Sequence, residues 1–254
     1  MVPAAKERRV LKDETRANQP WLKNRQWASG RCYDRTNRFT IAAAIFTIIF
    51  ASLTGLVING ILADPKHDPA LWILPIILGV PAVALGAWTI REIMVRVKFG
   101  RSMFEMETIP GAVGGWLAGS NRVPVKLNAE EGIRLELECI SNTQVRTIDG
   151  KLSARTNTLR SMKQTLRGDL PVENGCTCIP VAFKIPDKAR ATEKQRYETI
   201  SWKLHARASQ PGADYDATFI VPVYHVADAT VESPRVEADA ARLRTTHSAQ
   251  VAQD

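Results

Sequence analysis

The sequence predicts an α+β membrane protein, in which a two-helix transmembrane hairpin is followed by an antiparallel β-sandwich. Two uncharged apolar runs of 25 and 22 residues lie in the first part of the chain, and a helix needs roughly 20 such residues to cross a bilayer. After residue 101, apolar and polar residues alternate in several short segments, a pattern typical of half-buried strands. The 254 residues therefore suffice for one ordinary domain and a membrane anchor.

The net charge of +8 is concentrated beside the two apolar runs. Residues 1–38 contain ten Lys or Arg and four Asp or Glu, and residues 91–101 contain four basic residues and one acidic residue. Outside these flanks and the short link between the runs, basic and acidic residues balance. This distribution is typical of a membrane protein and gives the soluble part no net field to attract phosphates. We therefore expect a lipid bilayer as a partner and no nucleic acid.

The two apolar runs predict spans at about residues 39–63 and 70–91, within a hairpin over residues 39–93. The link ADPKHDP is long enough only for a tight antiparallel turn. Neither run has a polar face at helical spacing, which argues against buried helices of a soluble core. Neither run contains an ionisable residue, which argues against a transporter or a proton relay.

The positive flanks predict the orientation in the membrane. Cytoplasmic flanks are enriched in Lys and Arg, so residues 1–38 form a basic cytoplasmic leader and both termini are cytoplasmic. The expected location is the cell inner membrane, with two spans. The β-sandwich at residues 94–226 is then cytoplasmic too, and the four cysteines are expected to be thiols in a reducing compartment.

Basic and aromatic residues next to the spans predict contact with the membrane surface. The leader segment WLKNRQWASGR interleaves tryptophans with cations, so we expect it on the inner leaflet with the tryptophans in lipid. The alternative is an exposed leader with scattered aromatics. The predicted membrane-surface residues are Trp21, Lys23, Arg25, Trp27 and Arg31 in the leader, and Arg91, Arg96, Lys98 and Arg101 after the second span.

Period-two alternation predicts the strands of the sandwich. The segments GIRLELECI, VAFKIP, ETISWKLHARA and ATFIVPVYHV each place their apolar residues on one face. Asp149-Gly150 stands between two short strand-like runs and predicts a two-residue hairpin turn. Weaker strands are expected near residues 103–109 and 122–127. Residues 227–254 are expected to form a flexible tail with a short helix after Pro234.

Residues with chemical potential are few. Cys176 and Cys178 are weak candidates for a metal site, because two thiolates on one strand face still lack two ligands for zinc. His205 and His225 do not lie in a nucleophile motif. The glycine-rich run PGAVGGWLAG lacks the Lys-Ser/Thr of a phosphate loop. We therefore expect no enzyme activity, no cofactor and no small-molecule substrate.

The glycine-rich run instead predicts a docking element close to the membrane. Its candidate interaction residues are Gly111, Gly114, Gly115, Trp116 and Gly119. Loops at residues 187–196 and 209–214 are further candidates for contact with a partner, although an ordinary solvated loop is the alternative for the first.

Several segments resemble an uncharacterised family of bacterial inner-membrane proteins, which have two N-terminal spans and a soluble domain of unknown function. The resemblance lies in the leader WLKNRQWASGR, in KFGRSMFEMETIPGAVGGWLAG at 98–119, in IPVAFKIP at 179–186 and in ISWKLHARASQPGADYDATFIVPV at 200–223. The last two segments are also similar to the strand pattern of arrestin-like sandwiches. Both resemblances imply a fold and a location, and neither carries a catalytic residue.

Three functions follow as expectations. The first is a membrane-tethered module for protein–protein interaction without catalytic activity, with a membrane or cytoplasmic protein partner, as the arrestin-like resemblance implies. The second is an accessory or assembly subunit of a larger inner-membrane complex, which the glycines and prolines in the spans suggest. The third is a metal-handling protein or an enzyme that uses Cys176, Cys178 and a histidine.

Overall fold

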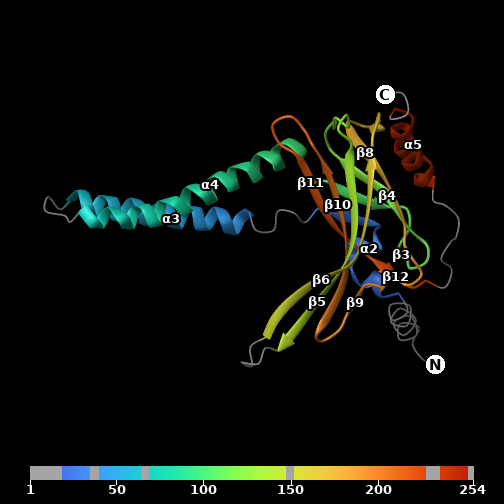
Figure 1. Ribbon diagram of the computed structural model, residues 1–254, viewed down its shortest axis with the longest axis horizontal. Coiled ribbons are helices and arrows are strands. Elements are labelled where there is room, and N and C mark those ends of the chain that lie inside the picture. Colours follow the sequence, from blue (N-terminus) through green and yellow to red (C-terminus); the bar gives the residue numbers. More distant parts are fainter. Residues whose placement is uncertain (1–18, 35–39, 64–68, 147–151, 227–234, 251–254) are drawn as a thin grey trace, which may run out of the picture. The chain divides into compact units, whose positions relative to one another are not determined.

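The computed structural model describes residues 19–34, 40–63, 69–146, 152–226 and 235–250. The chain divides into two compact units. One unit comprises residues 36–100 and is helical, and the other comprises residues 1–35 and 101–254 and is built mainly of strands. Figure 1 labels the elements of both units.

The helical unit contains α3 (Thr40–Ala63), the short helix η2 (Pro69–Trp72) and α4 (Ile73–Phe99). Residues 41–63 and 69–99 form helices long and apolar enough to cross a membrane. The two helices pack closely at glycines of α4, since a Cβ on Gly79 would lie 3.5 Å from Thr54 Cγ2 and one on Gly86 would lie 3.4 Å from Thr47 Cγ2. The helical region extends past the predicted boundary at residue 93, because the segment after the apolar run continues α4 without a helix breaker until Gly100.

The strands of the other unit form two antiparallel sheets and one parallel pair. The first sheet has the order β1 (Arg31–Tyr33), β2 (Met103–Met106), β4 (Trp116–Val123), β8 (Cys176–Lys184) and β7 (Val172–Glu173). The second has the order β11 (Tyr215–Val221), β10 (Glu198–Ala208), β5 (Ile133–Arg146) and β6 (Leu152–Leu166), with β9 (Glu193–Lys194) paired to β10. The parallel pair is β3 (Gly111–Ala112) with β12 (Val223–Tyr224).

The core lies between the two sheets, as the alternation predicts. The inward side chains of β5 and β10 are almost completely buried, and they are Ile133, Leu135, Leu137, Cys139, Ile200, Trp202, Leu204 and Ala206. Contacts between the sheets include the rings of Phe104 and Phe219, which lie 6.0 Å apart, and a hydrogen bond of 3.0 Å that Asn121 Nδ2 donates to Tyr215 Oη. Burial strongly raises the pKa of the Tyr215 hydroxyl, so Tyr215 remains neutral in the core.

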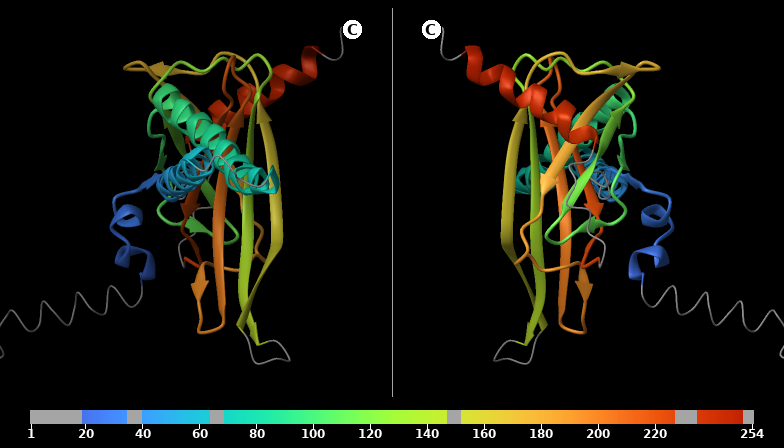
Figure 2. Two further views of the ribbon diagram at one scale, coloured as in Figure 1. Left: turned by 90° about the vertical axis from the view of Figure 1, so that its left-hand side faces the viewer. Right: turned by 90° about the vertical axis from the view of Figure 1, so that its right-hand side faces the viewer.

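The C-terminal helix α5 (Arg235–Gln250) packs on the first sheet. Ala240 is fully buried against Ala118 of β4 and Ala182 of β8. The carboxylate of Glu107 accepts hydrogen bonds from the backbone amides of Arg235 and Val236, at 3.1 and 3.2 Å, and so caps the N-terminus of the helix. Figure 2 shows α5 lying across the strands. The predicted helix is confirmed, but its described side chains belong to the folded unit and not to a flexible tail.

Three further features of the strands differ from what the sequence predicts. The strand expected at residues 122–127 is β4, which begins six residues earlier at Trp116. The hairpin around Asp149-Gly150 pairs as predicted, but β5 and β6 extend for 14 and 15 residues. The turn itself lies outside the described residues. The leader also contributes a strand, because β1 pairs with β2 in the first sheet.

Candidate interaction surface

The glycine-rich run, which the sequence predicts as a docking element close to the membrane, is largely buried within the β unit. Gly111, Gly115 and Gly119 are buried, while Gly114 and Trp116 are partly buried. Trp116 packs against the alanine cluster under α5. The run includes both β3 and the start of β4, so its backbone is already used in pairing.

Gly119 shows why glycine is needed in this run. It lies in the middle of β4, and a Cβ at this position would clash with the backbone oxygen of Glu105 and would be 2.9 Å from the Met106 Cα. Both atoms belong to the neighbouring strand β2. The glycine therefore permits a close approach of two backbones, which composition alone does not distinguish from a loop.

The leader tryptophans, predicted at the membrane surface, make contacts within the β unit. Trp21, in the short helix η1 (Pro20–Lys23), is only 8% exposed, and its ring lies 5.3 Å from that of Tyr224. Trp27, in α2 (Arg25–Ala28), donates a hydrogen bond of 3.1 Å from Nε1 to the Ile220 carbonyl. An amphipathic indole suits a protein groove as well as a membrane interface, so the sequence did not discriminate between them.

Five of the seven basic residues predicted at the membrane surface are exposed on α4 or near the start of the leader, and the other two make contacts within the β unit. Arg91, Arg96 and Lys98 are exposed on the last turns of α4. Lys23 and Arg25 are exposed near the start of the leader.

The other two predicted surface cations make contacts within the β unit. Arg31 of β1 forms an ion pair of 3.5 Å with Glu105. The Arg101 guanidinium lies 4.3 Å from the centre of the Tyr33 ring. Both contacts are partly exposed and contribute little net stability on their own.

The two cysteines proposed as weak metal ligands lie at the start of β8. Cys176 is partly exposed and Cys178 is buried. Burial, and then the nearby Glu173 carboxylate, raise the pKa of the Cys178 thiol, which disfavours the thiolate that a metal requires. Among the described residues, no group of three or more His, Cys, Asp or Glu is placed to hold a metal ion.

The outer part of the β5–β6 hairpin, residues 142–145 and 153–161, is largely exposed, and we call it the arm. Figure 1 shows β5 and β6 leaving the sandwich together. β6 is the last strand of its sheet. Every residue from 153 to 161 is exposed, so both faces of this part of β6 are in contact with solvent.

The opposite edge of the same sheet is covered by the leader. Asp34 Oδ1 accepts a hydrogen bond of 2.9 Å from the Thr218 amide of β11, and Trp27 Nε1 donates to the Ile220 carbonyl of that strand. The C-terminal end of β6 is also covered, because the Arg167 amide donates to the Leu243 carbonyl of α5 at 3.2 Å. The open edge is thus restricted to the part of β6 on the arm.

The open edge carries charges of one sign. Residues 152–166 contain Arg155, Arg160 and Lys163 and no Asp or Glu. Lys163 forms an ion pair of 3.1 Å with Glu136 of β5. Arg155 and Arg160 form no ion pair within the described part of the chain, and both are exposed.

Backbone geometry indicates which peptide groups of β6 face outward. The Gln144 amide of β5 donates to the Tyr197 carbonyl at 2.7 Å, on the β10 side of the strand. Gln144 is opposite Ala154 in the β5–β6 register. In an antiparallel ladder, the amide and carbonyl of one residue point to the same side, and successive residues alternate. The peptide groups of Ala154, and by the same alternation of Thr156 and Thr158, therefore face the open edge.

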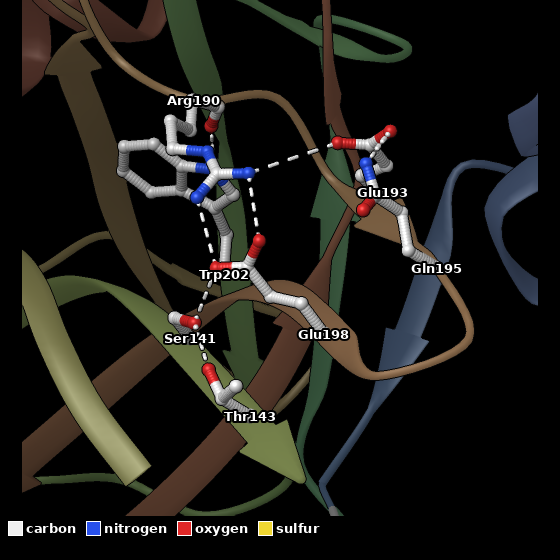
Figure 3. A network of polar contacts seen from close by, with 7 residues as sticks. All are labelled: Ser141, Thr143, Arg190, Glu193, Gln195, Glu198 and Trp202. Atoms are coloured by element: carbon white, nitrogen blue, oxygen red, sulfur yellow. Dashed lines mark hydrogen bonds and ion pairs between the residues drawn. The ribbon is translucent and has the colours of Figure 1, made fainter. Parts of the chain in front are cut away.

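A polar network fixes the base of the arm to the loop before β10 (Figure 3). Arg190 donates two hydrogen bonds to the Glu198 carboxylate, at 2.9 and 3.0 Å, and Ser141 Oγ donates to the same carboxylate at 2.7 Å. Trp202 Nε1 donates to the Arg190 carbonyl at 2.9 Å. The Arg190 guanidinium, and then the Ser141 hydroxyl, lower the pKa of the Glu198 carboxyl. The predicted partner-facing loop at residues 187–196 is thus held to the sheet at Arg190.

His205 lies on the outer face of β10, as the alternation predicts. Its Nδ1 is 3.0 Å from Thr218 Oγ1, and its Nε2 is 3.4 Å from a carboxylate oxygen of Glu138. Burial lowers the pKa of His205, and the Glu138 carboxylate partly opposes this effect. The cross-strand contacts account for this histidine as part of a polar sheet face.

Comparison with solved structures finds partial likenesses, one of which is to a sporulation protein. Crystal coordinates of Spo0M, a sporulation control protein from Bacillus subtilis, are similar over 49% of this chain and 49% of that chain, with 17% sequence identity and a TM-score of 0.35. The chain thus spans about half the length of that protein. No protein-family profile matches the chain. No curated protein matches it either.

The open edge of β6 was not among the predicted sites. The sequence LSARTNTLRSMKQTL has no clear alternation, because a strand exposed on both faces has no buried face to impose one. The available signals were the long polar run after Asp149-Gly150 and its cations without nearby acidic residues. The hairpin signal located the turn but not the length of the strands.

Proposed function

We propose that this protein is a membrane-anchored module for protein–protein interaction, without catalytic activity of its own. The observation that carries the proposal is the combination of an apolar helical hairpin with a separate β-sandwich that has an open strand edge. The hairpin holds the chain at a bilayer, and an open edge is a ready template for pairing with another chain.

We also propose a bacterial inner-membrane location with both termini cytoplasmic. The excess of basic residues in the leader and on the last turns of α4 supports this orientation. The partly exposed Cys176 provides a test. A membrane-impermeant maleimide applied to intact spheroplasts should leave Cys176 unlabelled and should label it after lysis, with Cys176→Ser as the control. Labelling of intact spheroplasts at Cys176 would reverse the orientation.

The β-sandwich is proposed to be arrestin-like. The two antiparallel sheets and the segments IPVAFKIP and ATFIVPV support this assignment, since both segments supply strands of the sandwich. Arrestin-like sandwiches bind other proteins through their surfaces, as the resemblance implies. An experimental structure of the full chain tests the assignment through its strand order.

Co-purification tests the function. Tagged full-length protein is isolated from native membranes in mild detergent, and the associated proteins are identified by mass spectrometry. Recovery of a stoichiometric protein partner supports an interaction module. Recovery of the protein alone, after crosslinking in intact cells, would contradict it.

An accessory subunit of a membrane complex is the second candidate, and one observation favours it. Gly79 and Gly86 contact α3, whereas a Cβ on Gly55 or Gly60 of α3 would meet nothing within 4 Å. Small residues on an open helix face permit close packing of another transmembrane helix. Loss of the partner in a Gly55→Leu/Gly60→Leu variant, but not in a Leu56→Ala control, would favour this candidate. Retention of the partner by the Gly55→Leu/Gly60→Leu variant would instead favour a contact through the β unit.

A further inference from the structure

We infer that the open edge of β6 binds an extended acidic segment of a partner protein by adding it as a further strand. The inference rests on the proposed interaction function and specifies its surface and the chemistry of its partner. The continuous part of the edge runs from residue 153 to residue 158 and ends at a β-bulge, where the register shifts between Cys139 and Ile140 and leaves Leu159 without a partner in β5.

The backbone of this edge provides the affinity. The peptide groups of Ala154, Thr156 and Thr158 face away from β5, as the hydrogen bond from Gln144 to Tyr197 indicates. An added strand satisfies these groups with its own amides and carbonyls, as in other cases of strand addition. Six residues in extended conformation span about 20 Å, which is enough for a short linear segment.

The side chains of the edge provide the selectivity. Arg155 lies within the continuous edge, and Arg160 lies just beyond the bulge. Both are exposed and neither forms an ion pair in the described part of the chain. Alternating Glu or Asp in the added strand would neutralise them, and opposite charges on neighbouring strands stabilise a pair.

The same charges disfavour a second copy of this chain as the occupant. Residues 152–166 contain three basic residues and no acidic residue, so antiparallel pairing of two β6 strands would bring like charges together. Like charges directly opposite one another on adjacent strands are destabilising. The edge therefore favours a partner of opposite charge over self-association.

The other strand edges of the unit are closed or short. The leader occupies β11 through Trp27 and Asp34. The edge strands of the first sheet, β1 and β7, have three and two residues. β7 pairs with β8 at residues 176–177 alone, but residues 178–183 of β8 are buried. Among the described strands, β6 is thus the exposed edge that offers a long run of outward peptide groups.

A peptide selection tests the inference with the full-length protein in detergent micelles. A phage-displayed library of random dodecapeptides is selected for binding, and the enriched peptides are measured by fluorescence anisotropy. We expect enrichment of acidic sequences without proline. Ala154→Pro removes one outward amide, and proline is tolerated on an edge strand. We expect this variant to weaken binding by at least about tenfold, or about 1.4 kcal/mol.

Charge variants separate the edge from general attraction. Arg155→Glu/Arg160→Glu should weaken binding by at least about tenfold at low salt. Lys126→Glu/Lys184→Glu makes the same change in net charge at exposed positions outside β5 and β6, and binding should stay within about twofold. Circular dichroism and unchanged solubility verify that each variant is folded.

Several outcomes would overturn the inference. The first is failure to enrich any peptide, and the second is enrichment of peptides without acidic residues. The third is peptide binding by the Ala154→Pro and Arg155→Glu/Arg160→Glu variants that equals binding by the unaltered protein. Binding of phosphatidylserine vesicles that is lost in the charge variant, with no peptide binding, would assign the edge to lipid instead. If the peptide test fails while native membranes still yield a protein partner, the proposed function stands and another surface carries it.

Discussion

The position of the leader leads to a prediction that distinguishes protein contact from lipid contact. Trp21 is 8% exposed and its ring lies against that of Tyr224. Replacement of a buried aromatic by alanine costs about 3–5 kcal/mol, and we take the lower end because the leader is peripheral. Trp21→Ala should therefore raise the equilibrium constant for leader opening by a factor on the order of 100.

Hydrogen exchange of β11 measures this opening. The Thr218 amide donates to Asp34 of the leader at 2.9 Å, so its protection depends on the leader staying in place. We expect faster exchange of the segment 215–221 in the full-length Trp21→Ala protein, measured by mass spectrometry. Trp27→Phe loses one hydrogen bond and should give a smaller effect, of about 1 kcal/mol.

A matched control lies in the helical unit. Trp88 of α4 is 42% exposed, and Trp88→Ala should leave exchange in β11 unchanged. If the leader tryptophans lay in lipid, brominated lipids would quench their fluorescence and exchange at residues 215–221 would not respond to Trp21→Ala. That pair of results would refute the assignment of the leader to the β unit.

Three further predictions concern the packing and the polar network. Ala240→Glu should release α5, because Ala240 is fully buried where the helix packs on the first sheet and a carboxylate there would be buried without a partner. Faster proteolysis of the C-terminal segment would report the release. Gly119→Ala should prevent folding, since its Cβ would clash with the backbone oxygen of Glu105 in β2. Gly55→Ala should be tolerated, since its Cβ would meet nothing within 4 Å, and expression and thermal unfolding compare the two variants. Arg190 is the main cause of the lowered pKa of the Glu198 carboxyl. The ionised carboxylate therefore stabilises the fold at pH values above the ordinary pKa of 4.5, and this stabilisation is lost as the pH falls through the lower pKa of the folded state. In the Arg190→Ala variant this loss of stability should begin at higher pH. An NMR titration of the Glu198 carboxyl gives the midpoint in the unaltered protein and in the variant.

The central strands could be predicted from the sequence because each has one buried face. Residues such as Leu135 and Leu204 alternate with charged neighbours, and the structure buries both. The apolar helices could be predicted because their length and lack of charge leave few alternatives. These signals are local, so a single sequence is enough to detect them.

The remaining features depend on contacts between distant parts of the chain. Trp21 suits a membrane interface and a protein groove equally well, and its contact with Tyr224 is visible only in the fold. Gly119 looks like part of a loop until β2 is placed beside it. Ala182 lies on a face that would be solvent-exposed without α5. β6 was missed over most of its length because it has no buried face on the arm.

The leader and the C-terminal helix α5 explain why the open edge is confined to one part of β6. The leader closes β11, and α5 reaches the end of β6 through the bond between the Arg167 amide and the Leu243 carbonyl. What remains open is a polar, positively charged strand segment that ends at a bulge. Bulges and cations protect edge strands from pairing with copies of themselves. The same cations attract an acidic strand, so a device that limits self-association also selects a partner by charge.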